Sequence, residues 1–121
     1  MVRQRLIHKM VYELGFPKNL IAVEKEIGSL PNFSFSAKRR LDLISYMNTS
    51  QGIVPLLLAE CKSVSLDEAA VRQAFGYNAA LGAFFICLAG QSEMKTLWLE
   101  QGKIASVPFL PPYAELIKLC C

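Results

Sequence analysis

The stretch PLLLAECKS, residues 55–63, decides how this chain folds and what chemistry it can support. Its apolar run predicts a buried strand, and the run leads directly into Glu60 and Lys62, an acid and a base two positions apart. Because successive side chains of a strand point to opposite faces of a sheet, the two charges are expected on one face, which they share with Leu56 and Leu58. A buried strand that ends in two charges on one face calls for a structural partner or a function.

Length and composition predict a single α/β domain. The chain has 121 residues, so we expect residues 1–121 to form one domain around one core. Hydrophobic residues make up 53% and charged residues 19%, which argues against disorder and fits a sheet covered by helices on both faces. The net charge of +3 is weak evidence for a nucleic-acid partner, and the basic clusters at residues 3–9 and 38–40 are expected to be solvated surface.

Other features of the sequence disfavour a membrane protein and a zinc protein. No stretch approaches the roughly 20 apolar residues that cross a bilayer, and the N-terminal region lacks the pattern of a signal peptide. The four cysteines and His8 lack the spacing of metal ligands. Because Cys61 and Cys87 fall inside apolar strands without a disulfide framework, we expect a reducing, cytoplasmic setting.

Periodicity and turn signals predict the order helix, three strands, helix, strand, hairpin and helix, in a mixed sheet. The apolar strand after the second helix is expected to be central. The helices are predicted over residues 2–15, from a capping box at Ser65 and Glu68 to about Leu81, and after Pro111-Pro112. The strands are predicted over residues 20–28, 39–47, 55–62 and 83–89, with a hairpin over 95–107 that turns at Gln101-Gly102.

The second and third predicted strands can bring two acids together. If they form a hairpin whose turn is centred near Gln51, Asp42 lies opposite Glu60 and Ile44 lies opposite Leu58. Directly opposed residues have Cβ atoms roughly 4.5–5.5 Å apart, so the two carboxylates would repel each other. Something has to offset this repulsion.

Three arrangements can do so: a shared proton, a basic side chain folded over the pair, or a divalent cation. Arg40 would lie opposite Lys62 in the same register, and either could supply the basic group. Mg²⁺ suits a site with one or two carboxylates because it keeps several waters and recruits phosphate oxygens. With Lys62 beside a metal-bound water, such a site would hydrolyse phosphodiesters. A structural ion-pair network at the end of a strand explains the same residues equally well.

The spacing of these residues resembles a known nuclease signature. The chain has Asp42 on one predicted strand and, after seventeen further residues, Glu60-Cys61-Lys62 on the next strand. This spacing resembles the PD-(D/E)XK pattern, although Leu41 replaces its proline. The stretches VEKEI, RRLDLISY, LLLAECKS and QAFGYNAALGAFFICLAG together resemble the N-terminal nuclease domain of type I restriction enzyme R subunits and their short stand-alone relatives. The resemblance covers about residues 2–113. It implies a restriction-endonuclease-like fold, an αβββαβ core with an edge hairpin and a C-terminal helix, and a DNA nuclease that uses Mg²⁺, with Mn²⁺ as a substitute.

The resemblance also implies roles for the residues around the strand ends. Asp42 and Glu60 are expected to bind the metal ion, with the carbonyl oxygen of Cys61 as a further ligand. Lys62 corresponds to the catalytic lysine.

Four further residues join the site in this interpretation. Gln73 and Tyr77 match a Q-x-x-x-Y element and lie four apart on one helix face, from which they can point toward the site and its DNA. The alternatives are an exposed polar residue for Gln73 and core packing for Tyr77. Glu24 resembles an early acidic residue that joins the metal shell, although Glu26 has the same strand parity. Arg40 is a candidate phosphate contact, or it neutralises the acids.

The leading prediction is therefore a Mg²⁺-dependent endonuclease that cleaves DNA. The chain contains no Walker A motif and no helicase segment, so translocation would need a separate motor subunit and specificity could need another partner. The alternative is a catalytically silent module with the nuclease fold that binds DNA or a protein. A third hypothesis is a homodimeric junction-resolving enzyme, since two cuts on a duplex need two active sites. The exposed face of the edge hairpin, with Trp98, is the candidate dimer interface.

Overall fold

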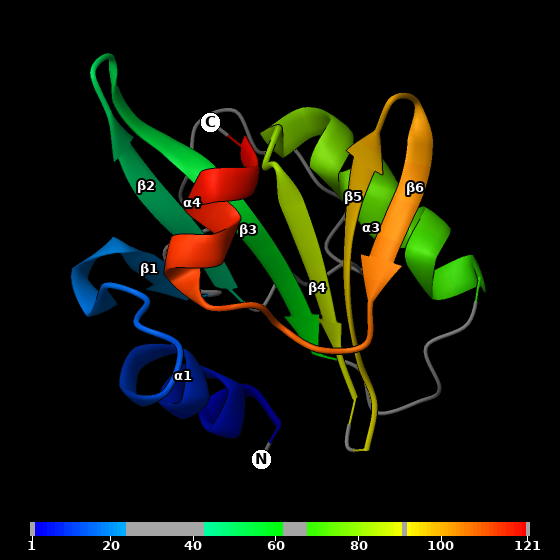
Figure 1. The fold of residues 1–121 in the computed structure, drawn as a ribbon. Helices are drawn as coiled ribbons and strands as arrows, with labels where there is room; N and C mark the ends of the chain where they lie inside the picture. The colour runs from blue at the N-terminus through cyan, green and yellow to red at the C-terminus, as the bar shows by residue number, and fades with distance from the viewer. Residues whose placement is uncertain (1, 24–42, 62–67, 91, 121) are drawn as a thin grey trace.

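The computed structural model describes residues 2–23, 43–61, 68–90 and 92–120. These residues form a six-stranded mixed sheet with helices on both faces, which confirms the predicted α/β class (Figure 1). None of the described helices is long and apolar enough to cross a membrane. In chain order the elements are α1 (Val2–Tyr12), the 3-10 turn η1 (Lys18–Leu20), β1 (Ile21–Val23), β2 (Leu43–Thr49), β3 (Gly52–Cys61), α3 (Glu68–Leu81), β4 (Phe85–Ala89), β5 (Met94–Glu100), β6 (Lys103–Val107) and α4 (Tyr113–Cys120).

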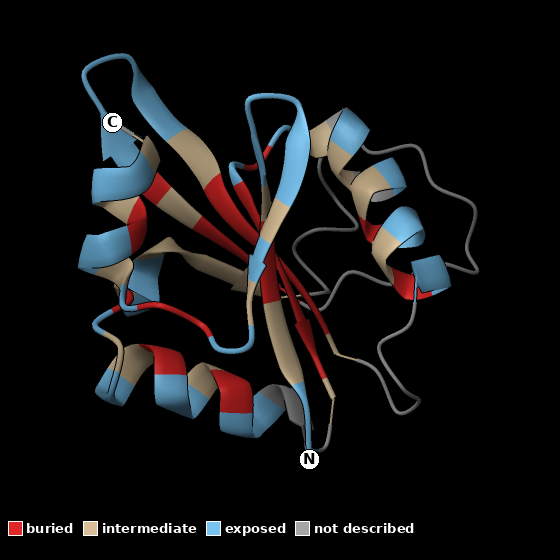
Figure 2. Ribbon diagram, turned by 45° about the vertical axis from the view of Figure 1, so that its right-hand side comes forward, coloured by how far each residue is buried: buried red, intermediate tan, exposed pale blue. Residues whose placement is uncertain are grey.

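The strands lie in the sheet in the same order as in the sequence. β3 and β4 are parallel, whereas all other neighbouring strands of the described sheet are antiparallel. A parallel pair needs a crossover connection, and α3 is that crossover helix. α3 covers one face of the sheet, while α1 and α4 cover the other (Figures 1 and 2). β4 lies in the interior of the sheet with all five residues buried, which confirms its predicted central place.

Each face of the sheet carries its own apolar cluster, and Figure 2 shows the buried residues concentrated in the sheet between the two helical layers. The face toward α3, here called the α3 face, packs against Ala70 and Ala74 of that helix. The opposite face, here called the α1 face, packs against Leu6, Met10 and Leu116. The α3 face includes Ile44, Leu58, Ile86, Leu88 and Leu97. The α1 face includes Leu43, Leu57, Ala59, Phe85 and Cys87.

A β-bulge interrupts the hairpin of β2 and β3. Thr49 pairs with Gly52 across a two-residue turn, and the ladder continues to Tyr46 opposite Pro55. The next pair is Ser45 with Leu57, which leaves one residue of β3 without a partner across the hairpin. The bulge follows Pro55, which has no N–H to donate, and prolines within sheets favour such positions.

The bulge decides which side chains share a face with Glu60. Val54 packs on the α1 face before the bulge, and Leu56, the unpaired residue of the bulge, and the following Leu57 pack on this face as well. The expectation that Leu56 shares a face with Glu60 is therefore wrong, because the extra residue reverses the alternation of β3. Leu58 lies on the α3 face as predicted, and its predicted pairing with Ile44 is confirmed.

Glycines end two of the helices and turn the edge hairpin where the sequence predicts. α1 ends at Tyr12, slightly before its predicted end, and Gly15 follows with φ of +75°. α3 ends at Leu81, and Gly82 follows with φ of +78°. The β5–β6 hairpin turns at Gln101-Gly102, both with positive φ, as a type I′ turn requires.

Candidate functional site

Glu60 is a buried carboxylate at the C-terminal end of an interior strand. It is the last residue but one of β3, and only 5% of its surface is exposed. Two residues after Leu58, it lies on the α3 face, opposite the fully buried Leu88 of β4. A carboxylate at this depth has to be balanced by a proton, a positive charge or a metal ion. This position makes Glu60 the strongest candidate for chemistry within the described residues.

The other charged residues predicted for the site lie outside the described residues. They are Asp42, Lys62, Arg40, Glu24 and the alternative Glu26. The described part of β2 begins at Leu43, which pairs with Ala59. The convergence of Asp42, Glu60 and Lys62 therefore stays a prediction, and so does the capping box at Ser65.

Cys61 ends β3 and is half-buried. Its side chain packs on the α1 face, away from Glu60. The predicted role of Cys61 uses its carbonyl oxygen, so this side-chain position is compatible with that role. The neighbouring Cys87 is fully buried, and desolvation raises the pKa of its thiol to about 12, although a hydrogen bond with the Thr96 side chain lowers it in part.

α3 carries Gln73 on a solvent-accessible side. Ala70 and Ala74 are buried against the sheet, whereas Gln73 is exposed. Tyr77 lies one turn later in the same helix, and its predicted role depends on a side chain outside the described set. The structure therefore places the helix over the face that carries Glu60 and leaves Gln73 available to a ligand.

Lys95 lies on the same face, although it is not among the residues predicted for the site from the sequence. Leu88 pairs with Glu60 on one side and with Lys95 on the other. Lys95 is half-buried and precedes Leu97, a member of the α3 face, by two positions. The signal in the sequence is the alternation of KTLWLE, residues 95–100, but it becomes useful only when the pairing of β5 with β4 is known.

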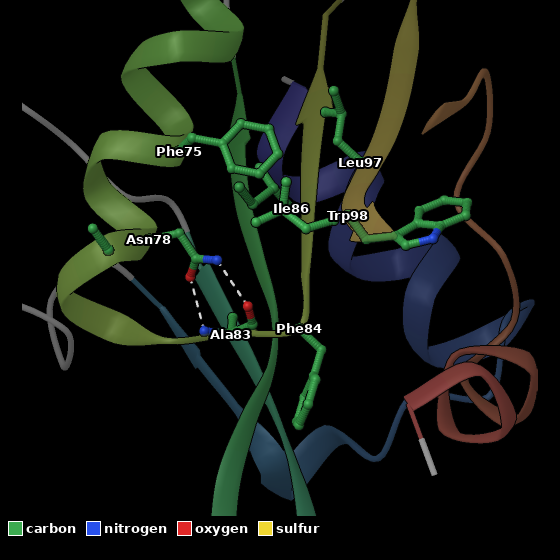
Figure 3. A pocket seen from close by; sticks show the side chains of 9 residues that line it. Phe75, Asn78, Ala83, Phe84, Ile86, Leu97 and Trp98 are labelled. Atoms are coloured by element: carbon green, nitrogen blue, oxygen red, sulfur yellow. Dashed lines mark hydrogen bonds between the residues drawn. The ribbon is translucent and has the colours of Figure 1, made fainter. Parts of the chain in front are cut away.

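A hollow of about 390 Å³ lies between the C-terminal half of α3, the start of β4 and the end of β5 (Figure 3). Its lining is mostly apolar, and the Asn78 amide hydrogen-bonds to both backbone groups of Ala83. It lies toward the start of β4, whereas Glu60 lies opposite Leu88 near the end of β4. Within the described part of the chain, no group of three or more His, Cys, Asp or Glu residues could hold a metal ion.

The edge hairpin does not present Trp98 as an exposed residue. Trp98 is half-buried, and its ring packs edge-on against Phe85 with 5.8 Å between the ring centroids. Leu99 and Ile104 are the exposed large apolar residues of this hairpin, at 63% and 56% exposure. An interface on the hairpin would therefore involve these two side chains more than Trp98.

Comparison with known protein families gives a match over most of the chain. The family model of the type I restriction enzyme R protein N terminus (HSDR_N) matches residues 1–111. No curated protein and no solved structure matches the chain significantly. The matched range contains α1, all six strands, α3 and both Glu60 and Lys95.

Proposed function

The chain belongs to the family of the type I restriction enzyme R protein N terminus, and from this premise we propose that it is a Mg²⁺-dependent DNA endonuclease of the PD-(D/E)XK type. The observation that carries the proposal is the buried Glu60 carboxylate at the end of an interior strand. In the sequence it is followed two residues later by Lys62. The family match connects the chain to restriction enzymes. Glu60 is the described residue that would take part in metal binding and hydrolysis.

The donor groups at this strand end fit a hard cation. We propose that Glu60 and Asp42 hold Mg²⁺ together with the carbonyl oxygen of Cys61, and that Glu24 can join them. The register supports this set, because Leu43 pairs with Ala59 and one further pair in the same ladder would join Asp42 to Glu60. When bound, the ion would polarise a water molecule and a phosphate oxygen.

The remaining residues would act on the DNA. The Lys62 ammonium would orient the attacking water and stabilise negative charge that develops on the phosphate. Gln73, exposed on α3, would bind a phosphate oxygen or orient a ligand, with Tyr77 beside it on the helix. Arg40 would add a contact to the DNA backbone.

The proposal also concerns partners and setting. As partners of this nuclease domain we propose DNA, a motor subunit for translocation and a specificity subunit for site selection. A homodimer would supply the two active sites that a double-strand break needs. The buried free Cys87 fits a reducing, cytoplasmic setting.

Cleavage of plasmid DNA with Mg²⁺ or Mn²⁺ tests the proposal. We expect cleavage by the wild-type protein and its loss in Asp42→Ala, Glu60→Gln and Lys62→Ala. Glu100→Gln is the matched control, since Glu100 is an exposed acid at the far end of β5. Equal cleavage by wild type and all variants would identify a contaminant and refute the enzymatic role.

Metal binding separates the active enzyme from the silent module. A ligand that binds only the folded state raises the unfolding temperature. Mn²⁺ should therefore stabilise the wild type and Lys62→Ala, but not Asp42→Ala or Glu60→Gln. DNA binding without any stabilisation by Mn²⁺ would favour the catalytically silent module.

A further inference from the structure

We propose that Lys95 binds a phosphate of the DNA strand within about three nucleotides of the phosphate that is cleaved. This inference rests on the proposed function and extends it to a residue outside the nuclease signature. Lys95 would thus help to hold the DNA backbone along the sheet, without taking part in the hydrolysis itself.

The sheet places Lys95 on a common row with Glu60. Glu60 of β3 pairs with Leu88 of β4, and Leu88 pairs with Lys95 of β5. All three belong to the α3 face, because Leu58 and Leu97 of this face lie two residues from Glu60 and Lys95. Two strand spacings of about 4.8 Å separate the backbones of Glu60 and Lys95 by roughly 10 Å.

The surroundings of Lys95 suit an anion from outside the chain. The residue is half-buried, and among the described residues no carboxylate lies within salt-bridge distance of its ammonium group. A half-buried lysine typically packs its carbon stem against the sheet and keeps its ammonium accessible to a ligand. An anion bound beside it would therefore meet no competing carboxylate among the described residues.

The spacing agrees with the geometry of a DNA backbone. Phosphates recur about every 3.4 Å of helix axis along each strand. A separation of roughly 10 Å spans about three such steps, so if the reacting phosphate binds at Glu60, the Lys95 ammonium on its flexible four-carbon stem can reach a phosphate within about three nucleotides on the same strand. Both residues lie at the same end of the sheet, where β3 ends and β5 begins (Figure 1).

The test measures binding of a fluorescent DNA duplex in EDTA, from about 50 to about 200 mM salt. Losing one phosphate contact should lower the slope of log affinity against log salt by about 0.9. We expect Lys95→Gln to bind roughly 3- to 10-fold more weakly at the lowest salt, with the difference narrowing as salt rises. Lys95→Arg should retain the wild-type slope, because it keeps the charge.

Lys103→Gln is the matched control, because it removes the same charge from the opposite end of the same hairpin. Its binding curve should follow the wild type. If Lys95→Gln fails to fold, Lys95→Met preserves the apolar stem and takes its place. Equal salt slopes for wild type and the Lys95 variant, an equal loss in Lys103→Gln, or no DNA binding by the wild type would overturn the inference.

Cleavage kinetics distinguish this inference from the proposed function. If both hold, Lys95→Gln raises KM with little change in kcat, whereas Lys62→Ala lowers kcat. If the wild type binds DNA with the expected slopes but cleaves nothing with Mg²⁺, Lys95 remains a DNA contact and only the nuclease proposal fails.

Discussion

The Asn78 side chain fastens the end of α3 to the start of β4 (Figure 3). Its Nδ2 group donates a hydrogen bond to the carbonyl oxygen of Ala83 at 2.7 Å, and its Oδ1 atom accepts one from the Ala83 amide at 2.8 Å. Ala83 is only 7% exposed, so water replaces these bonds poorly. Asn78→Asp keeps the shape of the side chain but removes the donor. At neutral pH it also sets a carboxylate against a carbonyl oxygen.

The expected cost follows from these two contacts. Loss of one hydrogen bond removes about 1 kcal/mol, and the carbonyl left without its donor adds about 1–2 kcal/mol. We therefore expect Asn78→Asp to lower the free energy of unfolding by roughly 2–3 kcal/mol at neutral pH. For a domain of this size, each kcal/mol corresponds to about 3–6 °C in Tm.

The loss of stability caused by Asn78→Asp should become smaller as the pH falls. The adjacent carbonyl oxygen and partial burial raise the pKa of a carboxyl group at position 78 in the folded state above its unfolded value. As the pH falls, the folded variant takes up a proton before the unfolded chain does, and the protonated group can again donate to Ala83. The stability difference from wild type should therefore shrink toward pH 4.

Urea denaturation of wild type, Asn78→Asp and the control Asn19→Asp at several pH values measures these differences. Asn19 is exposed in η1, so its variant should match the wild type throughout. Stability of Asn78→Asp equal to the wild type at neutral pH, or a deficit that does not change with pH, would refute the reasoning.

Three other predictions concern buried groups and the hairpin turn. The Ser45 hydroxyl is buried and has no hydrogen-bond partner among the described residues, so Ser45→Ala should raise the stability to urea by about 1 kcal/mol. Burial raises the pKa of the Cys87 thiol from near 9 in the unfolded chain to about 12 in the folded protein. As the pH rises from about 9 to about 12, the unfolded chain loses the thiol proton before the folded protein does, so the free energy of unfolding should fall. Alkaline unfolding curves should show a smaller fall in Cys87→Ala, and an identical fall would contradict this assignment. Gly102→Ala should lower the Tm by an amount that corresponds to about 1 kcal/mol, because the φ of +80° at this position is unfavourable for alanine. A Cβ at Gly102 would meet no atom within 4 Å, so the cost comes from the backbone alone. An unchanged Tm would exclude a backbone cost at this turn.

Much of the fold could be predicted because its signals are local. Apolar alternation, the glycines that follow α1 and α3, and the Gln101-Gly102 turn each act within a few residues. The pairing of Ile44 with Leu58 was also correct, but for an incomplete reason. The real turn is one residue tighter than a turn centred on Gln51, and the bulge restores the register beyond it.

The features that the sequence analysis missed depend on contacts between distant segments. The face of Leu56 follows from the bulge, for which Pro55 is the sole local hint. The place of Lys95 follows from the pairing of β5 with β4, which no pattern within β5 reveals. The acid pair itself was inferred from parity and resemblance, and of its two members only Glu60 lies within the described residues.

Because the bulge leaves one residue of β3 unpaired, β3 can lose one residue without losing its pairing with β2. Deleting one leucine from the run 56–58 would leave Tyr46 opposite Pro55 and Ser45 opposite the next leucine, so both halves of the ladder would keep their partners. The buried acid would stay on its side of the sheet, at the cost of some lost packing. An added leucine cannot be accommodated in this way. It would either enlarge the bulge or turn Glu60 toward the α1 face. The strand that carries the acid can therefore become shorter more safely than it can become longer.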